Sequence, residues 1–165
     1  RMKRLLSERQ HGYRARMSCS TTILQLLDDI LKNAEDGKES SLLMCDLSAA
    51  FDTVDHSLLV KKLRYYGLSE DCIKWFLSYL AGRTQYVDVN GSKSTTIPIK
   101  IGVFQGSVGG PLLFILFFND LMTLEDETTG ISIYADDNNY LCTLDKDKLL
   151  NQLKMKAKLE LISHA

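Results

Sequence analysis

The stretch Tyr134-Ala135-Asp136-Asp137 places two adjacent carboxylates between two segments that have the composition of β-strands. Residues 130–134 alternate isoleucine with other residues, and residues 139–144 are rich in Tyr, Leu, Cys and Thr, so both predict short strands. Adjacent carboxylates repel each other, and a divalent cation with oxygen ligands relieves that repulsion. The stretch therefore predicts a metal site at a hairpin tip. The alternative is a polar turn, because Asp and Asn are favoured in turns.

A further carboxylate upstream favours the metal site. Residues 41–47 form a mostly apolar run of strand length with Asp46 near its end. Two neighbouring strands that each carry an acid at one end can bring those acids together, as two-metal phosphoryl transfer requires, with ions about 3.5–4 Å apart. Asp46 with Asp136 and Asp137 is the predicted ligand set. Mg²⁺, or Mn²⁺ in its place, suits these hard oxygen ligands.

Four segments carry a resemblance to a known family. They are Gln10-His11-Gly12-Tyr13-Arg14 with residues 20–22, residues 46–56, residues 102–114 with residues 119–121, and residues 134–137. In this order and at this spacing they resemble the reverse transcriptase domain of a non-LTR (LINE-type) retrotransposon. The resemblance covers most of the chain and implies a fragment that contains part of the fingers and most of the palm.

The resemblance implies a role for each matching residue of the catalytic centre. Asp46 and Asp136 would be the metal ligands, with Asp137 beside them. Phe51 would lie under the sugar of the incoming nucleotide, where the bulk of its ring would exclude a 2′-hydroxyl.

Nucleotide binding is implied for four further residues. Gln105 and Gly106 would approach the incoming nucleotide and the template strand, Gly106 by leaving room for the backbone. Arg14 and Arg16 would contact the triphosphate, because guanidinium groups suit phosphate oxygens. A solvated surface charge is the alternative for each of these two arginines.

Three positions differ from the family's pattern. Phe104 stands where proline is usual, so the loop before Gln105 lacks a fixed φ. Gly109 stands where leucine is usual, so the next helix is expected to begin with two glycines. Ala49 stands where lysine is common. None of these changes removes a predicted metal ligand.

The activity implied by the resemblance is RNA-directed DNA polymerisation, with an RNA template, a DNA primer and deoxynucleoside triphosphates as partners. One alternative is a catalytically inactive retroelement remnant that acts at most as a folded binding domain. Another is a related palm protein, such as a maturase or a telomerase-like protein, because fold-level similarity does not fix function.

Composition is that of one globular domain without a membrane span. The 165 residues are 45% hydrophobic, enough for one sizeable core. Residues 1–40 are expected in the fingers and residues 41–165 mainly in the palm, with the thumb missing. Charge is balanced at 20 basic and 21 acidic residues, with a basic N-terminal end. The four cysteines have no metal or disulfide spacing, so we expect an intracellular protein, with a nuclear location implied by the resemblance. The oligomeric state is left open.

Helices are predicted over residues 20–34 with Ser20 as N-cap, 57–66, 70–80 with Ser69 as N-cap, from Pro111 to about Met122, and from Asp145 onward. Residues 85–89 and 94–103 are predicted to form a hairpin around Asn90-Gly91. Helices interleaved with antiparallel hairpins predict an α+β polymerase palm, in which helices cover one face of the sheet and the carboxylates lie on the other.

Overall fold

The chain forms two compact units in a computed structural model that describes residues 5–144. The first unit comprises the residues up to Ser48 together with those from Phe118 onward, and the second unit comprises Ala49–Phe117. The predicted division into fingers and palm at about residue 40 stays a prediction. The predicted helix from Asp145 lies outside the described residues.

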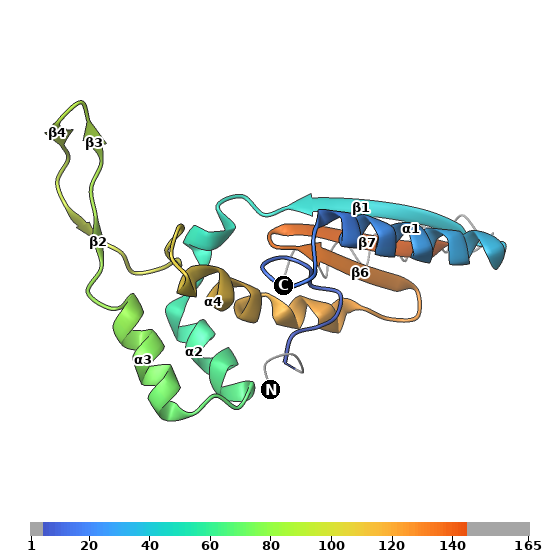
Figure 1. Cartoon of the computed structure of the whole chain (residues 1–165), viewed down its shortest axis with the longest axis horizontal. Helices are drawn as coiled ribbons and strands as arrows, with labels where there is room; N and C mark the ends of the chain where they lie inside the picture. The colour runs from blue at the N-terminus through green and yellow to red at the C-terminus, as the bar shows by residue number, and fades with distance from the viewer. Residues whose placement is uncertain (1–4, 145–165) are drawn as a thin grey trace. The chain divides into compact units, whose positions relative to one another are not determined.

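A three-stranded antiparallel sheet is the centre of the first unit (Figure 1). Its strand order is β1 (Glu39–Asp46), β7 (Asp137–Leu144), β6 (Thr129–Tyr134). The core on one face of the sheet contains Ile131, Ile133 and Tyr140, which pack with Leu43, Cys45 and three residues of the 3-10 helix η3 (Asn119–Leu124). All three strands were predicted from composition, with bounds that differ by a few residues.

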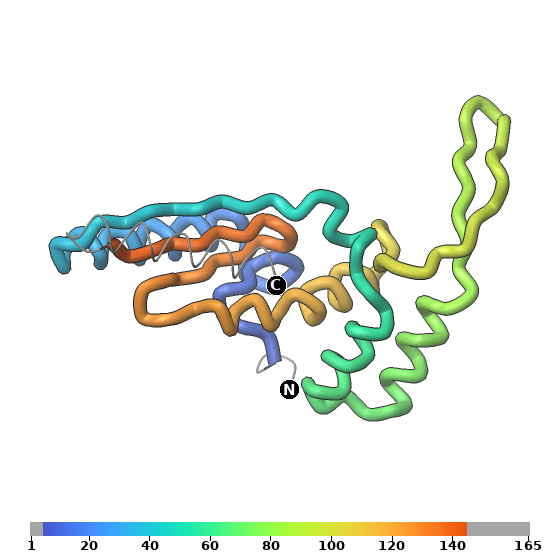
Figure 2. Tube along the Cα trace, turned by 180° about the vertical axis from the view of Figure 1, so that it is seen from behind, coloured from blue at the N-terminus to red at the C-terminus, as the bar shows by residue number. Residues whose placement is uncertain are grey.

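Helix α1 (Cys19–Glu35) runs along the sheet in both views (Figures 1 and 2). It begins earlier than predicted because Ser18, and not Ser20, is the N-cap. The Ser18 hydroxyl accepts a bond from the Thr21 N–H at 3.3 Å, and the Thr21 hydroxyl accepts one from the Ser18 N–H at 2.9 Å. This reciprocal pair is a capping box in which Thr21 takes the role usually held by Glu or Gln.

Three helices build the second unit. Helix α2 (His56–Tyr65) packs against α3 (Glu70–Leu80) and against α4 (Gly109–Phe117). Asp55 caps α2, and Ser69 caps α3 as predicted. Helix α4 begins at two glycines, as expected, but ends five residues earlier than predicted, and residues 119–124 continue as η3. The Asn119 side chain accepts a hydrogen bond from the Ser7 N–H and donates one to the Leu5 carbonyl. These two bonds hold Asn119 at the point where the predicted helix would continue.

A long hairpin extends from α3 within the second unit (Figure 1). Asn90 and Gly91 both have positive φ, at 51° and 85°, as a type I′ turn requires, so the predicted turn is confirmed. The strands are shorter than predicted and form two pairs, β2 (Thr84–Gln85) with β5 (Ile97–Pro98) and β3 (Asp88–Val89) with β4 (Ser92–Lys93). The ladder is interrupted where the Val87 N–H donates to the Ser94 side chain.

The predicted α+β class is confirmed by the mixture of four helices and antiparallel sheets in residues 5–144. One detail of the prediction is wrong. Helix α1 lies on the same face of the sheet as Leu42, Met44 and Asp46, so that face is not left free of helices. The reason is that β1 carries apolar side chains on both of its faces. Leu43 and Cys45 pack with the core on one face, and the apolar side of α1 faces Leu42 and Met44 on the other.

Candidate metal and nucleotide site

The register of the sheet brings two of the predicted metal ligands together. Asp46, the last residue of β1, is the direct partner of Asp137, the first residue of β7. Directly opposed residues of an antiparallel pair project to the same face of the sheet. Both residues are exposed. The two carboxylates therefore lie on the same face of the sheet and at the same end of its strands.

Asp136 lies in the two-residue turn that joins β6 to β7. Tyr134 pairs with Asp137, so Ala135 and Asp136 are the two central turn residues. Ala135 has a φ of 58°, a left-handed conformation that a two-residue hairpin of this kind needs at its first central position. Asp136 is half-buried. Its backbone carbonyl accepts a hydrogen bond from the side-chain amide of Asn138 at 2.8 Å.

The electrostatics of this edge fit a cation. Within residues 5–144, Asp46, Asp136 and Asp137 form no ion pair with a basic side chain. No cluster of three or more His, Cys, Asp or Glu side chains preformed for a metal ion occurs in the same part of the chain. Mg²⁺ typically takes one or two protein carboxylates and completes its shell with waters and substrate phosphates. Carboxylates that converge as a pair, with a third in the adjacent turn, fit that pattern of ligands.

Two tyrosines near the turn have perturbed acidity. Burial, and after it the negative charge of Asp136, raises the pKa of Tyr13 above its ordinary value. A side-chain hydrogen bond to Cys19 is the main cause that raises the pKa of Tyr134. Both phenols stay neutral near pH 7, so they add no charge to the acidic edge.

A groove of about 560 Å³ lies beside the carboxylates, between α1 and the sheet. Asp46 and Asp137 are at its rim, and its walls are mostly apolar side chains. The large apolar α1 residues on this wall are Ile23, Leu26, Leu27 and Ile30.

In the second unit, Phe51 is held by an aromatic contact. It belongs to the 3-10 helix η2 (Ala50–Thr53), and its ring stacks on that of Phe114 in α4 with centroids 4.2 Å apart and planes at 8°. Phe114 is fully buried, whereas Phe51 is half-buried. A buried ring beneath a half-buried one fixes the orientation of the upper ring, which is what a steric gate needs.

The loop of Gln105 and Gly106 is tied to the backbone of Phe51. The Val103 N–H donates to the Phe51 carbonyl at 2.7 Å, and the Gly102 N–H donates to the Val54 carbonyl at 2.8 Å. Gln105 and Gly106 are exposed, and Gly106 has a φ of 81° that favours glycine. A pocket of about 730 Å³ opens between Gln105 and the base of the hairpin.

Ser107 holds this loop in place next to Phe104, the position at which the family usually has proline. Its hydroxyl donates to the Phe104 carbonyl at 2.7 Å and accepts from the Gly110 N–H at 3.0 Å and from Tyr79 at 2.5 Å. The Phe104 ring packs edge-on against the Tyr79 ring at 5.4 Å. Hydrogen bonds and ring packing thus hold the turn that a fixed φ would otherwise restrain.

The two glycines at the start of α4 make a matched pair of substitutions. A Cβ at Gly110 would lie 2.3 Å from the Phe104 carbonyl oxygen, whereas one at Gly109 would lie 3.5 Å from the Tyr79 ring. We expect Gly110→Ala to lower the free energy of unfolding by about 1–3 kcal/mol, as overpacking does. Gly109→Ala should be neutral or slightly stabilising. Urea unfolding of both variants tests this, and equal stabilities would contradict it.

Arg14 and Arg16 differ in their surroundings. One Arg14 guanidinium nitrogen donates to the backbone carbonyls of Ser7 and Gln10, the latter at 2.9 Å. Arg16 is exposed and has a φ of 66°. A role of either residue at a triphosphate stays a prediction.

One residue of the acidic turn's surroundings was not predicted from the sequence. Gln10 is buried, and its side-chain oxygen accepts a hydrogen bond from the Ala135 N–H at 3.2 Å. The sequence signal was its position at the head of the first motif, two residues before a glycine. A buried glutamine is unusual enough to need a hydrogen-bonding explanation.

The sheet, its acidic edge and the hairpin turn together are those of a polymerase palm. Residues 1–162 match the family described as reverse transcriptase (RNA-dependent DNA polymerase), and the chain belongs to this family. This match, together with the transposon relatives reported below, confirms the resemblance to reverse transcriptases of non-LTR retrotransposons. Members of this family use divalent metal ions. Among residues 5–144, no helix combines the length and the apolar composition needed to span a bilayer.

Three relatives illustrate the match. The chain is 34% identical over 147 residues to the probable RNA-directed DNA polymerase from transposon BS of Drosophila melanogaster, covering 82% of the chain and 16% of the relative. It is 32% identical over 139 residues to the RNA-directed DNA polymerase from mobile element jockey of the same organism, covering 80% and 15%. It is 31% identical over 121 residues to the putative COX1/OXI3 intron 1 protein of Saccharomyces cerevisiae, covering 73% and 13%. The chain therefore spans about a sixth or less of these relatives.

Proposed function

We propose that the protein to which this chain belongs copies an RNA template into DNA as part of a non-LTR retrotransposon. The observation that carries the proposal is the register that sets Asp46 opposite Asp137 beside the turn residue Asp136. In the reaction, the 3′-oxygen of a DNA primer forms a bond to the α-phosphorus of a deoxynucleoside triphosphate. The bond from that phosphorus to the β-phosphate oxygen breaks, pyrophosphate leaves, and the hydroxyl proton passes to solvent.

Asp46 and Asp136, with Asp137 beside them, are proposed to hold Mg²⁺, for which Mn²⁺ can substitute. Bound there, the metal would lower the pKa of the primer hydroxyl and neutralise the charge on the leaving pyrophosphate. The support is chemical: hard oxygen ligands, no basic partner for them within residues 5–144, and a substrate whose phosphates complete the shell.

The protein's other predicted residues act on the nucleotide. Phe51 is proposed to lie against the sugar and exclude a 2′-hydroxyl. Gln105 and Gly106 are proposed to lie near the base pair being formed, and Arg14 and Arg16 near the triphosphate. RNA template, DNA primer and deoxynucleotides are the proposed partners, and a nuclear location remains part of the proposal.

An inactive remnant is not favoured, because the transposon relatives are named as RNA-directed DNA polymerases and this chain retains all three acidic residues. The match to an intron-encoded protein keeps a maturase-type role as the second candidate. The sequence that flanks the chain distinguishes the two, because an endonuclease region upstream favours the retrotransposon.

Metal binding by the 165-residue chain tests the site directly. We expect calorimetry with Mg²⁺ or Mn²⁺ and a deoxynucleotide to detect binding that weakens by more than about tenfold in an Asp46→Asn, Asp136→Asn double variant, because both changes remove charged ligands. Asp71→Asn, an exposed carboxylate on α3, is the control. Equal binding by the double variant, with its fold intact by circular dichroism, would contradict the ligand assignment.

A further inference from the structure

The segment of residues 9–13, here called the N-terminal strap, lies alongside β6 and reaches the acidic turn. The Ile133 N–H donates to the Arg9 carbonyl at 2.9 Å, and the His11 N–H donates to the Ile133 carbonyl at 2.8 Å. Gln10 and Ile133 form a parallel β-bridge. The strap therefore adds a short extended segment beside β6, the edge strand that leads into the turn containing Asp136.

Gln10 connects this strap to the turn itself. Its side chain is 1% exposed, and its oxygen accepts hydrogen bonds from the N–H groups of Gly12 at 2.7 Å and of Ala135 at 3.2 Å. Ala135 is also buried and directly precedes Asp136. Two buried backbone donors thus depend on one side-chain oxygen, and a buried donor without a partner is costly.

Gly12 lets the strap come this close. A Cβ at Gly12 would lie 2.3 Å from the Ala135 nitrogen and 2.7 Å from the Ala135 Cα. Such distances cannot be accommodated without a movement of the turn backbone. A glycine is therefore required at position 12, because the strap backbone there directly contacts the backbone of the turn that contains Asp136.

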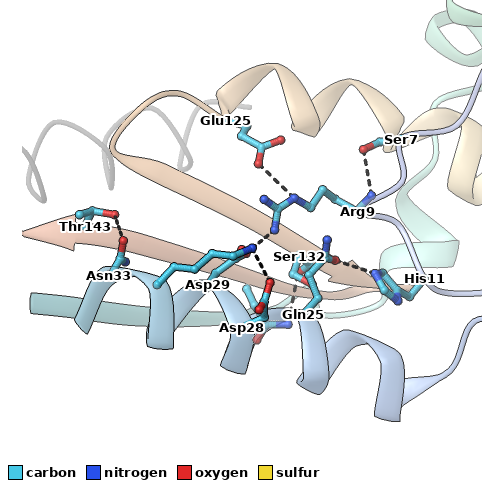
Figure 3. Close-up of polar contacts among 12 residues, drawn as sticks. Ser7, Arg9, His11, Gln25, Asp28, Asp29, Asn33, Glu125, Ser132 and Thr143 are labelled. Carbon is cyan, nitrogen blue, oxygen red and sulfur yellow. Dashed lines mark hydrogen bonds and ion pairs between the residues drawn. The ribbon is translucent and has the colours of Figure 1, made fainter. Parts of the chain in front are cut away.

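The strap is anchored to elements other than the turn. Arg9 forms ion pairs with Asp29 of α1 and, at 3.2 Å, with Glu125 (Figure 3). The His11 ring lies within hydrogen-bonding distance of Thr21 and Gln25 of α1, at 2.7 and 2.8 Å. Because α1 and the loop before β6 hold the strap on both sides, Gln10 is presented to the turn from a fixed position.

We propose that Gln10 is a positioning residue that holds the turn of Ala135 and Asp136 through the Ala135 amide. The hydrogen bond fixes the peptide that precedes Asp136 and so limits where the Asp136 carboxylate can lie. The consequence for catalysis rests on the proposed function, whereas the hold on the turn does not. The role belongs to the amide oxygen of Gln10 and does not require it to touch substrate or metal.

Amide hydrogen exchange in the 165-residue chain tests the hold on the turn. In Gln10→Met, which keeps the length of the side chain and removes the acceptor, we expect the Ala135 amide to exchange about fivefold to tenfold faster, because a hydrogen bond of ordinary net strength is lost. The Ile133 amide, bonded to the Arg9 carbonyl, should stay protected. Unchanged Ala135 exchange would overturn the proposal.

Two companion variants separate this role from general loosening of the strap. Gln25→Met removes a contact of the same strap that does not reach the turn, and Ala135 protection should then remain as in the wild type. Gln10→Glu keeps an acceptor oxygen and should retain that protection. An Ala135 amide that exchanges equally fast in Gln25→Met, or that is unprotected in folded Gln10→Glu, would overturn the proposal even if Gln10→Met does not fold.

Primer extension by the full-length protein tests the catalytic consequence. In Gln10→Met we expect the Mg²⁺ concentration for half-maximal rate to rise severalfold with the KM for template–primer unchanged, and Gln10→Glu to restore it. Unaltered metal dependence in the variant would overturn a role in catalysis. Absence of extension by the wild type would instead count against the proposed function, and the exchange result would stand by itself.

Discussion

Asp46→Asn and Asp136→Asn should each lower primer extension by the full-length protein by more than about a hundredfold. Replacement of residues outside the ligand shell of a metal already costs about 10- to 100-fold, and these two carboxylates are proposed as ligands. Asparagine keeps the shape of the side chain and removes its charge. The measurement is the single-turnover rate of deoxynucleotide addition on an RNA template with a DNA primer, at saturating Mg²⁺.

The control for this experiment is Asp71→Asn. Asp71 is an exposed residue of the first turn of α3, so it undergoes the same chemical change in the unit that does not contain Asp46 or Asp136. Its activity should stay within about twofold of the wild type, as expected for an exposed surface substitution. Extension that survives in either Asp46→Asn or Asp136→Asn would refute the assignment of that carboxylate to the metal.

The tip of the acidic hairpin was predictable because its signals are local. Alternating isoleucines before the turn and a β-rich segment after it gave both strands, and the polar turn lay between them. The register that sets Asp46 against Asp137 is not local, since the two residues are 91 positions apart and only strand pairing joins them. The strand ends predicted that acids would meet, and the pairing of β1 with β7 shows that the direct partner of Asp46 is Asp137.

The bounds of predicted elements differ from the observed ones where a side chain replaced a backbone interaction. Ser18 was passed over as N-cap because its capping partner is Thr21 rather than an acidic residue. The hairpin strands were predicted too long because Ser94 accepts the hydrogen bond that a strand carbonyl would take. In each case the residue type permits the interaction, but composition does not show that it is made.

The site was harder to predict than the fold for a related reason. The sequence places Gln10 at the head of the first motif, but it does not show that this side chain is buried and bonded to the turn. Its partners are backbone N–H groups, one of them 125 residues away. Backbone donors leave no signature in the sequence, so a positioning role of this kind becomes visible only in the structure.

Phe51→Val should reduce discrimination against ribonucleotides by about tenfold to a hundredfold. Exclusion of a single hydroxyl by the bulk of an apolar ring is worth about 1–3 kcal/mol, the range by which hydrophobic pockets distinguish one small group. Valine removes the ring and keeps the position apolar. The measurement is the ratio of kcat/KM for a deoxynucleotide to that for the matching ribonucleotide, in the full-length protein.

The contact with Phe114 makes this prediction sharper than loss of bulk alone. The two rings are parallel at 4.2 Å, so the face of Phe51 is set by a buried partner in α4. Phe51→Tyr keeps that stacking and should keep the discrimination. Phe114→Leu leaves the Phe51 ring in place but removes the platform beneath it, so discrimination should fall by less than in Phe51→Val. If Phe51→Val left the ratio unchanged, the stacked pair would serve packing of the second unit, and the gate would have to be another residue.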